Sequence, residues 1–371
     1  MQNISPIVKS TNDCNLRCSY CYVSDDNGNP RFFMPDGVLS STVSKILDYN
    51  NPSQPTEFIW HGGEPLLAGT DFFNGALSYQ EQYSRGHDIE NSIQTNLTIL
   101  DEKILSFLSR NNFRVGTSID GLAQTHDANR KTKAGRGTFD TVYTNLKRVK
   151  DAGLKVGAIV TLNRQNLGEM QNIYSLFRDL GVNFRINPVF YATREERYTS
   201  DFSMTPREYG LAMNELFDLW FFDKDHKIEI DTFVNILDNL LHKNLGDCHY
   251  SGSCQSGILL IDPNGDVYPC DKFDKKPEFV MGNIATDTLK RILDSPIRKS
   301  LMSRNVGEID DCKSCEQLDL CNGGCMYDGF VETEDFNAKS YFCEGDFLMF
   351  DHIKKRVSEQ LERARIKKSN D

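Results

Sequence analysis

Eleven cysteines are the residues of this chain with the most evident chemistry, and they fall into two groups. Three of them, Cys14, Cys18 and Cys21, lie near its start. The other eight lie in its last third: Cys248, Cys254, Cys270, Cys312, Cys315, Cys321, Cys325 and Cys343. Thiolates bind zinc and iron–sulfur clusters. Because three thiolates leave one iron of a four-iron cluster open and eight fully ligate two clusters, the counts predict one open centre and two closed ones.

Composition narrows the class of protein. The chain has 371 residues, enough for one large domain and a smaller one. Its first residues lack a secretory signal, and no apolar run is long enough to cross a bilayer. The odd number of cysteines argues against a disulfide scaffold. We therefore expect a cytoplasmic protein without a membrane partner, and the net charge of −11 argues against nucleic acid.

Strand-like and helix-like segments alternate through the first half of the chain. The predicted strands lie at residues 7–9, 57–60, 92–94, 114–117, 156–160 and 183–186. Between them, apolar residues recur at helical spacing, as in the segment that Thr138 opens and Gly153 closes. Such β–α repeats predict an α/β fold with a parallel sheet, open or closed into a barrel.

The second half has a different pattern. Thr205 and Glu208 form a capping box that predicts a long helix, within a helical bridge at residues 191–247. Residues 259–261 and 266–268 predict a hairpin, and residues 347–367 a closing helix. We therefore expect domains at 1–190, 191–247, 248–345 and 346–371.

Polar residues and glycines follow the predicted strands, where parallel α/β folds build their active sites. The first three cysteines follow the first strand, where a partial zinc site is an alternative. The candidates after the next strands are Gly62, Gly63, Glu64, Pro65, Asn96, Ser118, Asp120 and Arg130. Glycines allow a close backbone approach to a ligand, and Glu64 can accept a hydrogen bond from an ammonium group. For the strand-end polar residues a helix cap or turn is the alternative, and for Arg130 a solvated side chain.

The triad Cys14-x3-Cys18-x2-Cys21, with Tyr20 before its third cysteine, resembles the signature of the radical S-adenosylmethionine (radical SAM) superfamily. The segment from Gly62 to Pro65 resembles that family's GGEP motif. The resemblance implies a partial (β/α)6 TIM-like barrel, a [4Fe-4S] cluster on the triad and S-adenosylmethionine (AdoMet) at its open iron. The resemblance implies that Tyr20 and the candidates after the strands, from Gly62 to Arg130, contact AdoMet, and Arg130 could pair with its methionyl carboxylate.

The eight later cysteines resemble a SPASM domain, a small accessory region of radical SAM enzymes that modify peptides and proteins. By position, the resemblance assigns Cys248, Cys254, Cys270 and Cys325 to a first accessory [4Fe-4S] cluster. It assigns Cys312, Cys315, Cys321 and Cys343 to a second. The two ligand sets interleave, because Cys325 returns to the first cluster. Thiolate spacing alone does not choose the metal, so two zinc sites are the alternative.

Asp271 follows Cys270 directly. In the related anaerobic sulfatase-maturating enzymes, an aspartate beside this cysteine is proposed as the base that deprotonates the substrate. Asp271 matches it by position, and a structural hydrogen-bond acceptor is the alternative.

The resemblance implies a radical SAM oxidoreductase that acts on a peptide or protein side chain. Residues 59–69, 118–121 and 126–131 resemble maturases of ribosomally made peptides, which predicts an oxidative intramolecular cross-link, of the cyclophane or thioether type, in a precursor peptide. Because the barrel starts near residue 1, we expect no N-terminal leader-recognition domain. The alternatives are a sulfatase-maturating enzyme that oxidises Ser or Cys to formylglycine and a zinc-stabilised binding module. An electron donor such as flavodoxin or ferredoxin is expected as a partner.

Overall fold

The computed structural model describes residues 3–22, 32–225, 227–243, 248–252 and 254–370. It divides into two compact units, each built from two stretches of chain. The first unit combines Met1–Val160 with Gln255–Ser303, and the second combines Thr161–Cys254 with Arg304–Asp371. The domain boundaries expected at residues 190, 247 and 345 follow the sequence pattern instead and stay predictions; residue 247 lies outside the described residues.

The first unit is built on a parallel sheet whose strands match the predicted ones. The strands are β1 (Ser5–Thr11), β2 (Thr56–Gly62), β3 (Ile89–Gln94), β4 (Arg114–Ser118) and β5 (Val156–Leu162). Neighbours in this order pair in parallel, as in Ile7 with Ile59 and Ile59 with Ser92. Their carboxyl ends therefore meet at one edge, where the polar candidates follow.

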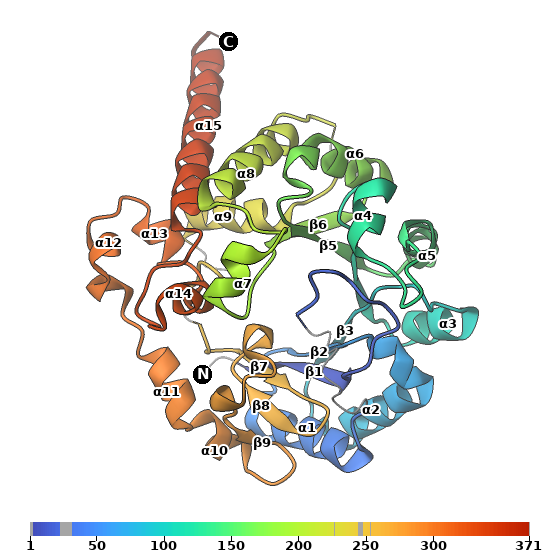
Figure 1. The fold of residues 1–371 in the computed structure, drawn as a ribbon. Helices are drawn as coiled ribbons and strands as arrows, with labels where there is room; N and C mark the ends of the chain where they lie inside the picture. The colour runs from blue at the N-terminus through green and yellow to red at the C-terminus, as the bar shows by residue number, and fades with distance from the viewer. Residues whose placement is uncertain (1–2, 23–31, 226, 244–247, 253, 371) are drawn as a thin grey trace. The chain divides into compact units, whose positions relative to one another are not determined.

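Helices connect these strands and bury their apolar faces. They are α1 (Asp36–Tyr49), α2 (Gly69–Tyr83), α3 (Glu102–Arg110), α4 (Ala123–Asn129) and α5 (Phe139–Asp151). Figure 1 shows α1 and α2 side by side next to β1 and β2. Val43 and Ile46 of α1, Phe73 of α2, and Phe58 and Trp60 of β2 are fully buried in this layer. The sheet and helix faces thus bury one another's apolar surface, which is the main stabilising force of such a fold.

The start of α5 differs in detail from the predicted one. Thr138 occupies the N-cap position, but its hydroxyl donates to the carbonyl of Arg130 at 2.8 Å and does not cap the helix. The side chain of Asp127 accepts the amides of Thr138 and Phe139 instead, at 2.7 and 2.8 Å. A residue eleven positions earlier therefore satisfies the free amides of this helix.

Part of the cysteine-rich region extends the same sheet. Strand β7 (Ile258–Ile261) pairs in parallel with β1, and antiparallel with β8 (Asp266–Tyr268). The predicted hairpin is thus confirmed, and β9 (Gly282–Asn283) adds a short edge. The order from β5 to β9 is β5-β4-β3-β2-β1-β7-β8-β9. The helices α10 (Leu289–Leu293) and α11 (Pro296–Met302) complete this unit.

The second unit continues the β–α alternation and then becomes helical. Its elements are α6 (Met170–Leu180), β6 (Asn183–Pro188), α7 (Arg194–Thr199), α8 (Pro206–Phe221), α9 (Asp231–His242), α12 (Asp310–Lys313), α13 (Leu318–Cys321), α14 (Met326–Thr333) and α15 (Cys343–Asn370). The strand order along the chain gives six β–α units, so the partial (β/α)6 barrel is confirmed.

Helices α8 and α15 pack along each other in this unit. The predicted capping box of Thr205 and Glu208 is present at the start of α8. Helix α15 begins at Cys343, four residues before the expected start, and buries Met349 and Phe350. Within the described part of the chain, no helix has both the length and the apolar character needed to span a membrane.

Candidate active site

Cys14, Cys18 and Cys21 lie in the loop that follows β1, as predicted. This loop is pinned to the segment after α4: the amide of Arg17 donates to the carbonyl of Lys131 at 2.8 Å, and that of Ser19 to Asn129 at 3.1 Å. Burial raises the pKa of Cys14 to about 12 and that of Cys18 to about 11. The three thiols are electrostatic neighbours. They are therefore placed to bind one cluster together, and each would lose its proton when it binds iron.

The glycine turn after β2 packs against the backbone that leads into this loop. The amide of Gly63 donates to the carbonyl of Thr11 at 3.0 Å, and that of Glu64 to Asp13 at 2.8 Å. A Cβ atom on Gly62 would collide with the Thr11 carbonyl, and one on Gly63 with that of Asp13. The glycines are thus required here because two stretches of the protein's own backbone approach closely.

Glu64 is fully buried and braces two strand ends. Its carboxylate accepts from the Thr95 hydroxyl at 2.6 Å, the Asn96 amide at 2.7 Å and the Leu66 amide at 3.0 Å. Burial raises its pKa to about 7, although these hydrogen bonds oppose the shift. A hydrogen bond from the ammonium group of a ligand to Glu64 stays a prediction. Pro65 follows as the first residue of a short 3-10 helix, η1 (Pro65–Ala68).

Asn96 and Ser118 lie at the ends of β3 and β4, as expected. The side-chain amide of Asn96 donates to Asn15 at 2.9 Å and approaches the Cys14 sulfur at 3.9 Å. Its carbonyl oxygen accepts from Thr98. The Ser118 hydroxyl accepts from Gln94 at 3.2 Å. The Asn96 side chain thus lies directly beside the first ligand cysteine.

Tyr20, Asp120 and Arg130 contact one another around the fully buried Asp120 carboxylate. Arg130 donates to both carboxylate oxygens of Asp120, at 2.8 and 3.2 Å, and its guanidinium lies 5.4 Å from the centre of the Tyr20 ring. The Tyr20 hydroxyl donates to Asp120 as well. Burial alone would raise the pKa of Asp120, but Arg130 lowers it below its usual value. Pairing of Arg130 with the methionyl carboxylate stays a prediction.

A second polar group surrounds Asp271 in the first unit. Of its members, the sequence analysis predicted Asp271 alone. Asp271 starts the 3-10 helix η3 (Asp271–Phe273). It is an electrostatic neighbour of Tyr22 and His61, both of which are half-buried. Burial raises the pKa of Tyr22 and lowers that of His61, and Asp271 favours the protonated form of each. The signal for His61 was its place beside Gly62.

His61 has a defined orientation within this group. The amide of Gly62 donates to its Nδ1 at 2.8 Å. The carbonyl of Gly62 lies 3.3 Å from the same nitrogen, so the tautomer of His61 decides whether Nδ1 accepts from the amide or donates to the carbonyl.

The four cysteines assigned to the second accessory cluster come together in the second unit. Burial raises the pKa of Cys343 to about 11, and Cys312 and Cys315 add to the shift. Burial also raises the pKa of Cys321, which has Cys343 and Cys312 as neighbours. Among the described residues, no set of His, Cys, Asp or Glu side chains converges as a site for a single metal ion.

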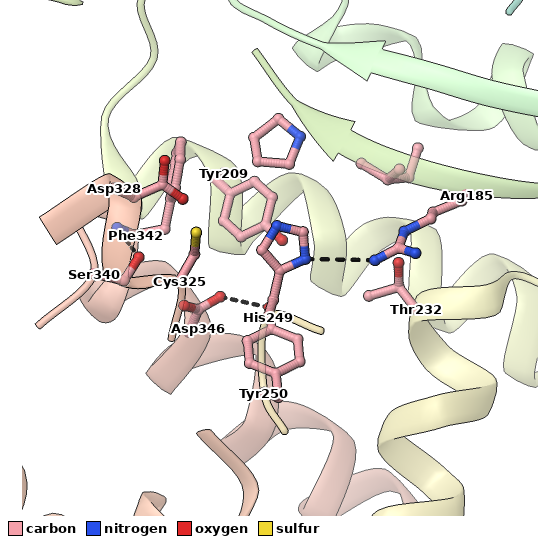
Figure 2. Close-up of a pocket in the computed structure, with 12 residues that line it drawn as sticks. Arg185, Tyr209, Thr232, His249, Tyr250, Cys325, Asp328, Ser340, Phe342 and Asp346 are labelled. Atoms are coloured by element: carbon pink, nitrogen blue, oxygen red, sulfur yellow. Dashed lines mark hydrogen bonds between the residues drawn. The ribbon is translucent and has the colours of Figure 1, made fainter. Parts of the chain in front are cut away.

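The cysteines assigned to the first accessory cluster are divided between the units. Cys248, Cys254 and Cys325 belong to the second unit and Cys270 to the first. Figure 2 shows Cys325 in the wall of a pocket of the second unit. The other polar lining includes Arg185, Tyr209, His249, Asp328 and Asp346. The Tyr250 hydroxyl donates to Asp346 at 2.8 Å there. Cys325 thus faces space inside its own unit.

Two protein-family models match the chain. The Radical SAM superfamily model matches residues 8–177, which include the first three cysteines, the glycine turn and Arg130. The SPASM model, an iron–sulfur cluster-binding domain, matches residues 248–316. The second match includes five of the eight later cysteines.

Curated relatives match nearly the whole chain. A serine-type anaerobic sulfatase-maturating enzyme of Bacteroides thetaiotaomicron is 30% identical over 92% of this chain and 86% of its own length. A cysteine-type enzyme of Clostridium novyi is 30% identical over 93% of each chain. A solved structure, native anSMEcpe with bound AdoMet and Cp18Cys peptide, superposes with a TM-score of 0.89. It is 26% identical and covers 97% of this chain and 99% of its own.

Proposed function

The chain belongs to the radical SAM superfamily and carries a SPASM domain, and from this premise we propose that it oxidises a serine or cysteine of a protein substrate to formylglycine. It is an oxidoreductase with [4Fe-4S] clusters and AdoMet as cofactors. The observation that carries the proposal is the near full-length similarity to sulfatase-maturating enzymes of both types. Because the chain belongs to a superfamily of enzymes, the zinc-stabilised binding module considered in the sequence analysis is no longer an alternative.

The residues of the first unit fit the cofactors that the family uses. When bound to the chain, the cofactors would supply removal of a hydrogen atom from the substrate and, at the accessory clusters, an acceptor for the second electron. Cys14, Cys18 and Cys21 would hold the open cluster. Glu64 holds the backbone that follows β2 and β3, and Asn96 lies beside Cys14. Arg130 forms an ion pair with Asp120.

Asp271 is the candidate base of the reaction. Oxidation of a serine side chain to an aldehyde removes one hydrogen atom, one proton and one electron. Asp271 would take the proton, and His61 is an electrostatic neighbour of its carboxylate. For a cysteine substrate the same loss gives a thioaldehyde, which water converts to the aldehyde with release of hydrogen sulfide.

The cross-linking maturase stays a second candidate. The segments at residues 59–69, 118–121 and 126–131 resemble peptide maturases, which is the observation that favours it. The same hydrogen-atom removal would then be followed by bond formation between two side chains of a precursor peptide. The near full-length relatives favour formylglycine over this reaction.

The two functions differ in the product that mass spectrometry detects. The anaerobically purified enzyme would be incubated with AdoMet, a reductant and two substrates: a sulfatase fragment with the target Ser or Cys, and a precursor peptide of a cross-linking maturase. We expect an aldehyde on the sulfatase fragment that a hydrazide traps, with backbone fragments on both sides of it. A peptide product that resists hydrazide and lacks fragments between two residues would overturn formylglycine formation and establish the cross-link.

The role of Asp271 is tested by comparing two products of one reaction. Asp271→Asn removes the base and keeps the shape, so product should fall at least tenfold while 5′-deoxyadenosine continues to form. Asp266→Asn is the matched control, because Asp266 lies on β8 and its carboxylate accepts hydrogen bonds from Asn264 and Asn283. Equal loss of both products in Asp271→Asn would contradict a dedicated base.

Two further expectations accompany this function. A low-potential donor such as flavodoxin or ferredoxin would supply the electron that starts the reaction. The free cysteines predict a reducing compartment, for which we propose the cytoplasm. Purification of the chain from cells with an affinity tag, followed by identification of bound flavodoxin or ferredoxin, would test the first.

A further inference from the structure

The turn between Cys321 and Cys325 has an unusual backbone. Its three inner residues, Asn322, Gly323 and Gly324, all have positive φ angles of 47°, 76° and 65°. Left-handed conformations normally occur as single residues, and glycine is the residue that adopts them without strain. This turn connects two cysteines that the resemblance assigns to different accessory clusters. The shape of this turn therefore determines how Cys321, of the second ligand set, is placed relative to Cys325, of the first.

Arg304 clamps this turn through its carbonyl groups. Its Nη1 donates to the carbonyl of Gly324 at 2.9 Å, and its Nη2 donates to those of Gly323 at 3.0 Å and Ala338 at 2.8 Å. The approach is close: a Cβ atom on Gly323 would lie 3.0 Å from Nη2. The rigid fork of a guanidinium suits such multiple contacts, which an ammonium group cannot reproduce.

A second anchor binds the same turn to the first ligand set. The side-chain amide of Asn322 donates to the carbonyl of Tyr250 at 2.8 Å. Tyr250 lies between Cys248 and Cys254, so the turn is attached at one side to their loop. Gly323 also accepts the amide of Ser340, three residues before Cys343, at 3.1 Å. The clamped turn therefore joins segments that carry ligands of both clusters.

Arg304 also has a donor that the protein does not use. Its Nε is buried and has no hydrogen-bond partner among the described residues. Burial lowers the pKa of Arg304, and four cysteines oppose this: Cys325, Cys254, Cys312 and Cys321. Two of these belong to each predicted cluster. An arginine remains charged even when buried, so a positive charge lies among thiolate ligands of both sets.

We propose that Arg304 is a positioning residue shared by the two accessory clusters. It holds the turn that joins their ligands, and its charge and Nε–H group stabilise the reduced form of at least one cluster. The potential of an iron–sulfur cluster depends on net charge and on hydrogen bonds to its sulfur atoms. The proposal rests on the ligand assignment and is independent of the substrate, so its failure would leave formylglycine formation untouched.

The test measures the midpoint potentials of the clusters in the intact enzyme. Arg304→Gln removes the charge and the fork, and the potentials would be followed by electron paramagnetic resonance during a redox titration. We expect the midpoint potential of at least one accessory cluster to fall by about 59 mV. For a one-electron couple this lowers the reduced-to-oxidised ratio at a fixed potential tenfold. The cluster of Cys14, Cys18 and Cys21 is the internal reference. Unchanged potentials of both accessory clusters would overturn the proposal.

A second variant separates the charge from the clamp and covers the case in which Arg304→Gln does not fold. Arg304→Lys keeps the charge and loses the fork and the Nε–H group, so its potentials should lie between those of Arg304→Gln and the parent. Its turn should be weaker, and iron should be lost to a chelator at least threefold faster. An iron-loss rate equal to that of the parent would refute the clamp.

The control is Arg148→Gln in the first unit. Arg148 also binds a backbone carbonyl, that of Leu100 at 3.0 Å, together with Asn145 and Glu102. No cysteine is among these partners. The control should change neither the rate of iron loss nor the cluster potentials. A change as large as that of Arg304→Gln would mean that loss of any carbonyl-binding arginine perturbs the clusters. That outcome would refute a specific role for Arg304.

Discussion

Asp120 stays ionised in a buried position because Arg130 lies beside it. Removing one partner of such a pair would leave an uncompensated charge, a loss of about 3–5 kcal/mol. The pair also orders the Tyr20 ring, which precedes Cys21. The same three residues were each expected to contact AdoMet. Their first role in the structure is to support one another and the cysteine loop.

His126 is a buried histidine that makes folding depend on pH. Burial lowers its pKa to about 4, whereas an unfolded histidine has an ordinary value near 6.5. The folded state thus binds fewer protons, so stability is complete above about pH 6.5 and is lost as the pH falls toward 4. We expect His126 to account for about 2 kcal/mol of the loss in unfolding free energy between pH 7 and pH 5.

The measurement is denaturant unfolding of parent and variant at several pH values. His126→Gln keeps a polar side chain near Thr138, whose hydroxyl lies 3.1 Å from the His126 Nε2. The variant should have a flatter pH dependence than the parent. His242→Gln is the control, because His242 is exposed on α9 and pairs with Asp238 of the same helix. Parallel pH curves for His126→Gln and the parent would contradict this role.

At this scale the sequence predicted the residue types but not their partners. Arg130 was identified as a candidate from its place after the strand end, and its partner was expected to be a ligand. The structure pairs it with Asp120, ten residues earlier. Such a pairing depends on how α4 brings the two side chains together. His61, beside the predicted Gly62, was missed because its relation to Asp271 depends on residues more than 200 positions apart.

Strand β1 connects the cysteine loop to the segment that contains Asp271. Lys9 of β1 is 2% exposed and forms ion pairs with Asp262 at 2.5 Å and Asp274 at 2.8 Å. Asp262 begins the turn between β7 and β8, and the amide of Asp274 donates to the Asp271 carbonyl. Burial alone would lower the pKa of Lys9, but the two aspartates raise it above its usual value. One ammonium group thus joins three elements.

Lys9→Met should destabilise the fold and disturb the position of Asp271. It leaves two buried carboxylates unpaired, so we expect a loss of about 3–5 kcal/mol in the free energy of unfolding. In the surviving folded enzyme, 5′-deoxyadenosine should form in greater excess over product than in the parent. Denaturant unfolding and the ratio of the two products would measure these effects.

A companion variant shows whether the unpaired charges cause the loss. Adding Asp262→Asn and Asp274→Asn to Lys9→Met should restore most of the stability, because no buried charge remains. Lys313→Met is the surface control, since Lys313 is half exposed and its pair with Asp310 contributes at most about 1 kcal/mol. If Lys9→Met were no more destabilising than Lys313→Met, the joining role would be wrong.

The parallel strands could be predicted because each has a local pattern of apolar residues. The position of β7 could not. Its segment predicted only a hairpin with β8, since neighbouring segments with a tight turn are visible in sequence. Its parallel pairing with β1 joins Ile7 to Leu260 across some 250 residues, and no local pattern specifies such a partner. The Lys9 ion pairs depend on this same pairing, so they were missed as well.

The whole molecule separates the cysteine groups. The first three lie in the first unit, and all four assigned to the second accessory cluster lie in the second unit. Each unit has its own buried core, such as Trp60 and Phe73 in the first and Phe217 and Phe350 in the second. Loss of one cluster in the first unit should therefore leave the ligand set of the second unit folded.

Replacing Cys14, Cys18 and Cys21 together with Ala tests this independence. The open cluster should be lost, so no 5′-deoxyadenosine should form from AdoMet. About two thirds of the iron should remain, because two of three four-iron clusters keep their ligands. Iron and sulfide analysis, with spectra of the reduced protein, would measure this. Loss of nearly all the iron would mean that the accessory clusters depend on the first, and continued 5′-deoxyadenosine formation would contradict the ligand assignment of the triad.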